Sequence, residues 1–263
     1  MVGFNSYPPL NEVKSGKLSM EKKCSAVIIG VGPERGLGAA LSKYFAGKGL
    51  HVFIAGRSED KLHKIADKIR QKGGSATPVV ADATVEHDVA HLFKMAQLDD
   101  YSIDIAAYNV DSNIPSPLLE TDTETFTKLW QQNCLGAFLF GKEAINAMKD
   151  RRQGTLFFTG ATASLRAKPP FTAFASAKAG LRALAQGAAR EFSPQGIHVV
   201  HAIIDGVIDG ERARNQFPDY VKAKGRDGLL QLDAIAETYW AIHKQHSSAW
   251  THELDLRPFK EPF

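Results

Sequence analysis

Residues 27–38 have the sequence VIIGVGPERGLG, and this stretch decides which fold the chain can adopt. It begins with apolar β-branched residues, which are typical of a buried parallel strand. Glycines follow at Gly32, Gly36 and Gly38, and the apolar residues after them recur at helical spacing. A strand, a glycine turn and a helix start together present free backbone N–H groups that can bind the pyrophosphate of a dinucleotide. The alternative interpretation is an ordinary turn from a strand into a helix.

Strand and helix patterns alternate along the rest of the chain. Apolar runs predict six further strands, over residues 51–55, 76–81, 103–107, 155–158, 197–204 and 250–256. Helical patterns lie between them, and the longest is expected to run from a capping box at Thr121 and Glu124 to about Met148. The alternation predicts an α/β protein, a single Rossmann-type domain. Its doubly wound parallel sheet would have about seven strands and helices on both faces.

The composition also describes one domain with a large core. The 263 residues are 44% hydrophobic and 23% charged, which suits a single α/β domain. The net charge of +3 is too small to indicate a nucleic-acid surface, and no apolar run approaches membrane-spanning length. Cys24 and Cys134 do not form the pattern of a disulfide framework, so we expect a reducing compartment, the cytoplasm.

Residues 1–22 differ in composition from the rest of the chain. They contain Pro8, Pro9, Gly16 and several lysines but no apolar core, so we expect an N-terminal extension outside the fold. They lack the apolar region of a signal peptide, and Met20 is an alternative start of the chain. The Rossmann-type domain would then comprise residues 23–263.

Two arginines indicate which dinucleotide the glycine turn would bind. Arg57 follows the second strand, about twenty residues after the turn, and Arg35 lies inside the turn. An acid after the second strand typically binds the ribose hydroxyl of NAD, whereas an Arg there accommodates the 2′-phosphate of NADP. Ser58 could donate to that phosphate or cap the next helix. We therefore expect NADP(H) as the cofactor, and the alternative is that both arginines are solvated.

Several motifs between about Cys24 and the C-terminus resemble those of the short-chain dehydrogenase/reductase family. The glycine turn is similar to the family's TGxxxGxG loop, with Val31 in the place of Thr. The segments YNVD at 108–111, FASAK at 174–178 and DG at 205–206 stand in the places of NNAG, YxxxK and the start of PGxxxT. The resemblance implies nicotinamide-dependent oxidoreductase chemistry. Together with Arg35, Arg57 and Ser58 from the argument above, the expected cofactor contacts are Gly32, Gly36, Leu37, Gly38, Asp82, Asn109, Lys178 and Gly206.

The catalytic tetrad that the resemblance implies is incomplete in this chain. In the family, Tyr exchanges the proton at the substrate oxygen, Ser orients the substrate, Lys holds the nicotinamide ribose and Asn sustains a water relay. Here Phe174 stands in the place of the Tyr, and by spacing Ala161 stands in the place of the Ser. Asn133 and Lys178 remain at the catalytic positions. Asn133 would either position water or satisfy backbone groups in a bent helix.

Two classes of function therefore stay open. In the first, the protein is an NADP(H)-dependent oxidoreductase of small molecules, with water held by Asn133 and Lys178 as one possible proton donor. In the second, it is a non-catalytic NADP(H)-binding protein that acts through its conformation or its partners. A structural protein without a cofactor is a third alternative, and nothing in the sequence identifies the substrate.

Metal binding and assembly complete the expectations. His87 and His91 are one helical turn apart, but no third ligand is evident beside them, so no metal is expected.

The helices over 121–148 and 171–191 carry apolar residues on more than one side, which indicates burial against a second copy. In the family the equivalent helices form a four-helix bundle, so we expect a homodimer or a homotetramer. The apolar residues concerned are Leu135, Phe138, Leu139, Phe140, Leu181 and Leu184.

Overall fold

The computed structural model describes residues 23–98, 101–225 and 227–261, and in them a single parallel sheet organises the chain. The sheet has seven strands in the order β3-β2-β1-β4-β5-β6-β7, and every neighbouring pair is parallel. This is the predicted doubly wound Rossmann-type fold. The strands are β1 (Lys23–Ile29), β2 (His51–Gly56), β3 (Ser75–Val80), β4 (Tyr101–Tyr108), β5 (Gly154–Ala161), β6 (Ile197–Ile204) and β7 (Glu253–Leu256). The expected N-terminal extension and Met20 lie outside the described residues.

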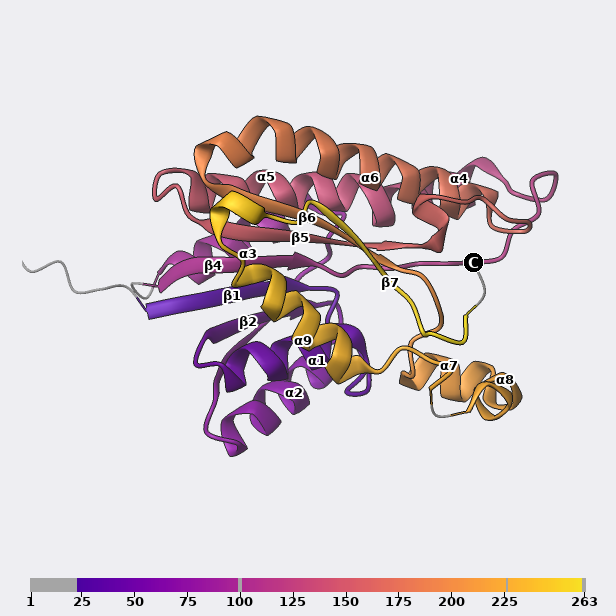
Figure 1. Ribbon diagram of the computed structural model, residues 1–263, viewed down its shortest axis with the longest axis horizontal. Helices are drawn as coiled ribbons and strands as arrows, with labels where there is room; N and C mark the ends of the chain where they lie inside the picture. Colours follow the sequence, from indigo (N-terminus) through magenta and orange to yellow (C-terminus); the bar gives the residue numbers. More distant parts are fainter. Residues whose placement is uncertain (1–22, 99–100, 226, 262–263) are drawn as a thin grey trace, which may run out of the picture.

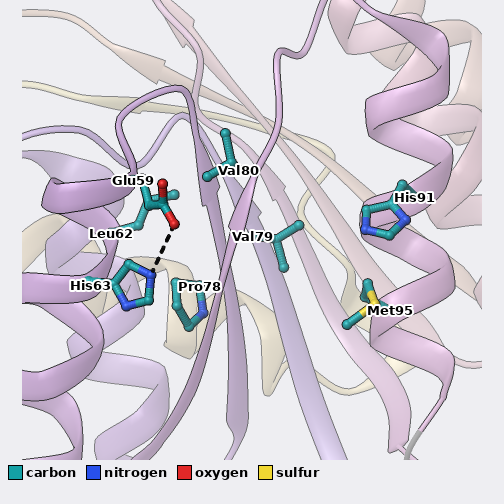
Figure 2. A pocket seen from close by; sticks show the side chains of 8 residues that line it. All are labelled: Glu59, Leu62, His63, Pro78, Val79, Val80, His91 and Met95. Atoms are coloured by element: carbon teal, nitrogen blue, oxygen red, sulfur yellow. Dashed lines mark ion pairs between the residues drawn. The ribbon is translucent and has the colours of Figure 1, made fainter.

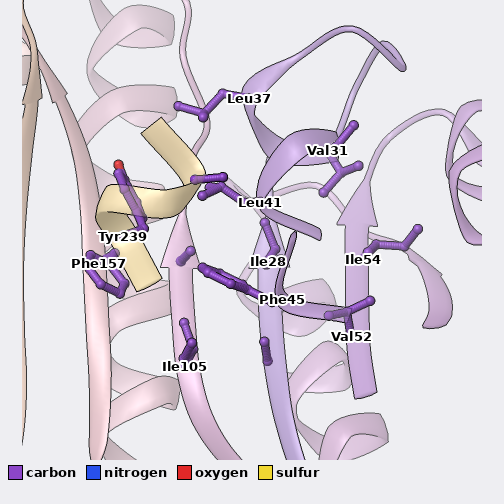
Figure 3. Packing of buried hydrophobic residues seen from close by; sticks show 14 of the residues in the cluster. Ile28, Val31, Leu37, Leu41, Phe45, Val52, Ile54, Ile105, Phe157 and Tyr239 are labelled. Carbon is purple, nitrogen blue, oxygen red and sulfur yellow. The ribbon is translucent and has the colours of Figure 1, made fainter. Parts of the chain in front are cut away.

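Helices cover both faces of the sheet, as Figure 1 shows. One face carries α1 (Leu37–Gly47), α2 (Glu59–Gln71) and α9 (Leu232–His243), and the other carries α3 (Glu86–Gln97), α5 (Gly136–Lys149) and α6 (Thr172–Phe192). Successive strand residues point to opposite faces, so the strands contribute to two separate apolar cores. In the first core, Tyr239 of α9 stacks on Phe157 of β5 with ring centroids 4.6 Å apart (Figure 3).

The carboxyl ends of the strands are covered by loops and two short helices. The polar segment 209–224 contains two helices, α7 (Glu211–Gln216) and α8 (Pro218–Lys224). The division falls at Phe217, because the residue before a proline is disfavoured in the helical conformation. Both helices lie beyond the sheet (Figure 1), at the edge where ligands bind in folds of this type.

The long helix predicted over 121–148 is not one regular helix. It consists of α4 (Thr123–Trp130), a π-helical segment (Gln131–Leu135) and α5. Within the π-helical segment, the carbonyl of Gln132 accepts a hydrogen bond of 2.5 Å from the hydroxyl of Tyr108 at the end of β4. This contact from the sheet supports the bulge, and segments of this kind are frequent at functional sites.

The predicted cap of α4 was wrong by one residue, whereas the predicted cap position of α2 is confirmed. The side chain of Asp122, not Thr121, caps α4 by accepting from the Thr125 amide at 2.7 Å. The Thr121 hydroxyl bonds instead to the Pro117 carbonyl at 2.9 Å. Ser58 occupies the N-cap position of α2 without a capping hydrogen bond from its side chain. The starting residues of α2 and α4 were therefore better predicted than the side-chain hydrogen bonds that cap them.

The first edge of the sheet is formed by β3, which contains Pro78. A pocket of about 320 Å³ lies along it, with Glu59 and His63 of α2 on one side and His91 and Met95 of α3 on the other (Figure 2). His87 and His91 stack one turn apart on α3 with ring centroids 6.5 Å apart. Within the described residues, no three His, Cys, Asp or Glu side chains are grouped as metal ligands.

Most of the apolar residues that suggested a second buried helix face are buried within the domain. Leu139, Phe140 and Leu181 belong to the second core, and Leu135 and Leu184 pack against it. Phe138 differs, because 48% of its surface is exposed. Of the helices that the structure describes, none is both long and apolar enough to cross a membrane.

Candidate active site

The glycine turn forms the first part of the candidate site. The amides of Gly30 and Val31 both donate to the Ala55 carbonyl, at 3.0 and 2.9 Å, which ties the turn to β2. A side chain at Gly38 would place its Cβ 2.8 Å from the Gly30 carbonyl oxygen, so glycine allows α1 to start against the strand. A Cβ at Gly32 would meet no described atom within 4 Å, which leaves the space above the turn open.

The start of α1 fits an anionic group. Its N-cap residue is Gly36 and its first residue is Leu37, and among the described residues no side chain caps this helix end. Its first turn also contains no acidic residue. The unpaired amides and the positive end of the helix dipole therefore face the open space, and they can bind a pyrophosphate.

Arg57 lies at the carboxyl end of β2, where the sequence places it. Its side chain is exposed and makes no hydrogen bond or ion pair with any described residue. Ser58 follows it, and its hydroxyl is not used in capping α2. A guanidinium and a hydroxyl are thus available beside the glycine turn, and both can donate to a phosphate.

Arg35 is not available in the same way. Its Nη2 atom lies 2.8 Å from Oδ2 of Asp209, and its Nε donates to the Asp209 carbonyl at 3.2 Å. Asp209 also accepts from Arg214 of α7 at 2.6 Å, and these two arginines hold the pKa of the Asp209 carboxyl below its ordinary value. The guanidinium of Arg35, predicted as a second phosphate-binding group, is therefore paired with the carboxylate of Asp209, which it shares with Arg214.

Asp82 and Asn109 shape the loops next to the turn. Oδ1 of Asp82 accepts from both the amide and the hydroxyl of Thr84, at 2.9 and 2.7 Å, and so orders the loop after β3. The Asn109 amide donates to the Ile29 carbonyl at 3.0 Å, and the backbone of Asn109 packs directly against Gly30. Gly30 has a φ of 90°, so this packing requires glycine there, a role that the sequence motifs did not indicate.

Lys178 is the most buried charge of the site, with only 1% of its side chain exposed. Its Nζ donates to the Thr159 carbonyl at 3.1 Å and lies 3.2 Å from Oδ1 of Asp111. The ring of Phe174 has its centroid 5.7 Å from the same Nζ. Phe174 itself is 5% exposed, so the residue in the tyrosine's place packs as an apolar partner of the ammonium.

Asn133 lies in the π-helical segment and is fully buried. Its Nδ2 donates to the carbonyls of Leu129 at 2.9 Å and Ser112 at 3.2 Å. Its Oδ1 accepts from the Ser112 amide at 3.4 Å. Of the two expected roles, satisfying backbone groups is therefore realised by these contacts, which join the bent helix to the loop after β4.

Ala161 ends β5, and the hydroxyls near it are engaged elsewhere. The Ser164 hydroxyl oxygen accepts from the Ala161 amide at 3.2 Å, and Thr162 donates to Oδ1 of Asp205 at 2.5 Å. Asp205 also binds Arg166 at 2.6 Å and forms an ion pair with Arg257. Burial opposes ionisation of Asp205, but Thr162 and the two arginines lower its pKa below the ordinary value.

The remaining predicted contact, Gly206, follows Asp205 and packs against the Pro258 side chain. The structure thus brings Gly32, Gly36, Gly38, Asn109 and the loop residue Asp82 to one edge of the sheet, with Arg57 and Lys178 on either side. Two acids, Asp111 and Asp209, were not among the predicted site residues. Asp111 stands in the last position of the YNVD segment, where the family motif has a glycine, and that departure was the available signal.

Comparison with known proteins agrees with this geometry. A family model described as short chain dehydrogenase matches residues 26–220. A short-chain dehydrogenase structure from Rhodopseudomonas palustris superposes with a TM-score of 0.77 at 36% identity, over 90% of this chain and 99% of that one. Two curated relatives are each 27% identical. The first is the oxidoreductase YxjF of Bacillus subtilis, aligned over 80% of both chains, and the second is 3beta-hydroxysteroid dehydrogenase 1 of Eggerthella lenta, aligned over 84% of this chain and 87% of its own. The chain therefore belongs to the short-chain dehydrogenase family of oxidoreductases.

Proposed function

We propose that this protein binds NADP(H) and acts as an oxidoreductase with an incomplete catalytic tetrad. The observation that carries the choice of cofactor is the guanidinium of Arg57, which has no partner among the described residues and lies beside the open glycine turn. A ribose carrying a 2′-phosphate would find a cation there, whereas the free 2′-hydroxyl of NAD would lack the acid that usually binds it. Both cysteines are free, which supports a place in the cytoplasm.

Each part of the proposed cofactor site has a distinct task. The start of α1 at Gly36 and Leu37 would bind the pyrophosphate, while Arg57 and Ser58 would bind the 2′-phosphate. Lys178 would hold the nicotinamide ribose. When bound, NADPH supplies a hydride. Neither Phe174 nor Ala161 carries a group that can exchange a proton or orient a carbonyl, so a proton would have to reach the substrate from water.

A second candidate, a non-catalytic NADP(H)-binding protein, is favoured by the state of the remaining tetrad residues. The Asn133 amide is bonded to backbone groups on both its nitrogen and its oxygen. Lys178 is engaged by Thr159 and Asp111. A protein of this kind would keep the cofactor site while its output would come from conformation or partner binding.

Titration calorimetry tests the proposed cofactor. NADPH should bind about 10- to 100-fold more tightly than NADH, because charge-assisted hydrogen bonds contribute about 1.5–3 kcal/mol. Arg57→Ala should remove most of this difference while leaving NADH binding almost unchanged. Arg190→Ala provides a control, because it removes an exposed arginine near the end of α6. Equal affinities for the two cofactors in the natural chain would contradict the proposal.

A further inference from the structure

The buried ammonium of Lys178 already has an anionic partner inside the candidate site. Asp111 lies in the loop after β4, and its Oδ1 is 3.2 Å from Nζ of Lys178. Because Lys178 is 1% exposed, this ion pair is shielded from water on the lysine side. Asp111 itself is 41% exposed, so its carboxylate forms part of the accessible surface of the site.

Asp111 is also held from the opposite side. Its Oδ2 lies 3.7 Å from Nη1 of Arg212 on α7, and Arg212 donates to the Asn113 carbonyl at 3.0 Å. The carboxylate therefore stands between a lysine on α6 and an arginine on the helix beyond the sheet. These contacts fasten α7 to the loop after β4.

A sugar hydroxyl is a weaker partner for Lys178 than this carboxylate. Lys178 has three N–H donors, of which the Thr159 carbonyl and Asp111 accept two. The bond to Asp111 joins two opposite charges, whereas a bond to a sugar hydroxyl joins the ammonium to a neutral group. One N–H of Lys178 is left for a ribose, so a ribose whose two neighbouring hydroxyls both accept from the ammonium must compete with Asp111.

We infer that Asp111 is an affinity-determining residue of the cofactor site. Its carboxylate takes one N–H of Lys178 and has to release it when both hydroxyls of the nicotinamide ribose of NADP(H) accept from the ammonium. This inference rests on the proposed function, because it assigns the nicotinamide ribose to Lys178. It predicts that the natural chain binds the whole dinucleotide less tightly than the remaining contacts would allow.

The test compares two probes by titration calorimetry. NADPH contains the nicotinamide ribose, whereas adenosine 2′,5′-bisphosphate contains only the adenine half and its 2′-phosphate. Asp111→Asn removes the charge and keeps the shape, so NADPH affinity should rise about fivefold while affinity for the bisphosphate stays within about twofold. Asp111→Ala serves as a second variant, and thermal unfolding curves verify that each variant is folded.

A double-mutant cycle shows whether the effect passes through Lys178. In a Lys178→Met background, Asp111→Asn should change NADPH affinity by less than about twofold, because the competed ammonium is gone. Asp104→Asn is the matched control. It breaks an ion pair of the same 3.2 Å length, with Arg151, in the first half of β4 and away from the site, and it should leave both affinities unchanged.

The possible results separate the inference from the function on which it rests. NADPH binding that is unchanged or weaker in Asp111→Asn, with the bisphosphate still bound, overturns the inference and leaves the proposed cofactor intact. An equal gain for both probes, or a gain that survives Lys178→Met, also overturns it, because the carboxylate would then act by general repulsion. Failure of every variant to bind either probe overturns the inference together with the proposed cofactor.

Discussion

Phe174 and Ala161 are the two residues that the proposed function places at the incomplete positions of the tetrad. The Phe174 ring is buried against the Lys178 ammonium, and it cannot donate a proton. The three hydroxyls near Ala161 in sequence are those of Thr159, Thr162 and Ser164, and they are bonded to the Tyr239 hydroxyl, to Asp205 and to the Ala161 amide, respectively. Hydride transfer to a carbonyl in this site would therefore lack both a positioned acid and an orienting hydroxyl.

We predict little or no NADPH-dependent reduction of generic aldehydes, ketones and quinones by the natural chain. A positioned proton donor is worth about 10²–10⁴ in rate, so Phe174→Tyr combined with Ala161→Ser should create measurable activity. NADPH affinity should stay nearly the same, since neither residue would bind the phosphates. The assay follows NADPH absorbance for both proteins over one substrate panel. Robust turnover by the natural chain that survives Lys178→Ala and Asn133→Ala would show that other residues perform the chemistry.

At the scale of residues, the sequence located the candidate site residues whose position follows from a strand end or a turn. Arg57 directly follows the end of β2, and it is exposed and has no partner among the described residues. The glycines lie at the turn between β1 and α1. Arg35 and Lys178 were recognised as cations, but their acidic partners were not. Arg35 and Asp209 are 174 positions apart in the sequence, so only the folded chain brings them together.

At the scale of elements, a partly buried polar network joins the second half of the sheet to α6. Nδ1 of His201 on β6 lies 2.8 Å from Glu253 on β7, and Glu253 accepts two hydrogen bonds of 2.7 Å from Arg182. Arg182 lowers the pKa of Glu253 to about 2, with a smaller contribution from His201. Burial lowers the pKa of His201 to about 4, so near neutral pH the histidine is uncharged and its Nδ1–H donates to the carboxylate.

These pKa values predict an acid-sensitive fold. A histidine whose pKa falls from 6.5 to about 4 on folding binds fewer protons than in the unfolded chain, so the free energy of unfolding decreases as pH falls between these values. The loss for His201 is about 3 kcal/mol, and His243, also lowered to about 4 by burial, acts in the same direction. Glu253 adds to the loss below its ordinary value of 4.5.

Urea unfolding at a series of pH values measures this effect. The natural chain should lose stability steadily from pH 6.5 to pH 4, and His201→Asn should make the dependence shallower because one depressed group is removed. The slopes are compared, not the absolute stabilities, since the substitution also alters packing beside Gly160, where the His201 ring leaves no room for a side chain. An unchanged slope in the variant would rule out His201 as a source of the pH dependence.

Periodicity predicted most strands and helices well, because β1, β2, β4, β5 and β6 are largely buried and the longer helices each have one apolar face. It failed for the break between α4 and α5. The apolar pattern continues on the inner face on both sides of the π-helical segment, so the pattern does not reveal it. The hydrogen bond that supports the segment comes from Tyr108, 24 positions before Gln132. The α4 cap was misplaced by one residue, because Thr121 and Asp122 are both good capping residues and the loop contacts of Thr121 decide between them.

At the scale of the whole molecule, exposed aromatic residues on α4 and α5 indicate how copies associate. Phe126 and Trp130 of α4 and Phe138 of α5 are 44%, 41% and 48% exposed. Large apolar side chains exposed in this way on neighbouring helices are typical of interaction surfaces. A homodimer that buries the three rings across a twofold axis, or a tetramer built from such dimers, is the assembly that we propose.

Light scattering tests the assembly. The natural chain should be a dimer or a tetramer at micromolar concentration, and Phe138→Asp should yield smaller species by placing a charge in the contact. Leu119→Asp is a suitable control, because it places the same charge at an apolar residue that is 99% exposed, in the loop before α4, and is not one of the three aromatic residues. A natural chain that is monomeric under these conditions would refute the proposal.

The proline in β3 has a consequence for how such assemblies can grow. β3 is the first edge of the sheet and pairs with β2 alone, and Pro78 in its centre has no N–H to offer to a further strand. A second chain cannot continue the hydrogen-bonded ladder across this position. The sheets of two molecules are thus prevented from pairing edge to edge along β3. This edge is protected against amyloid-like strand addition, while the helices remain free to associate.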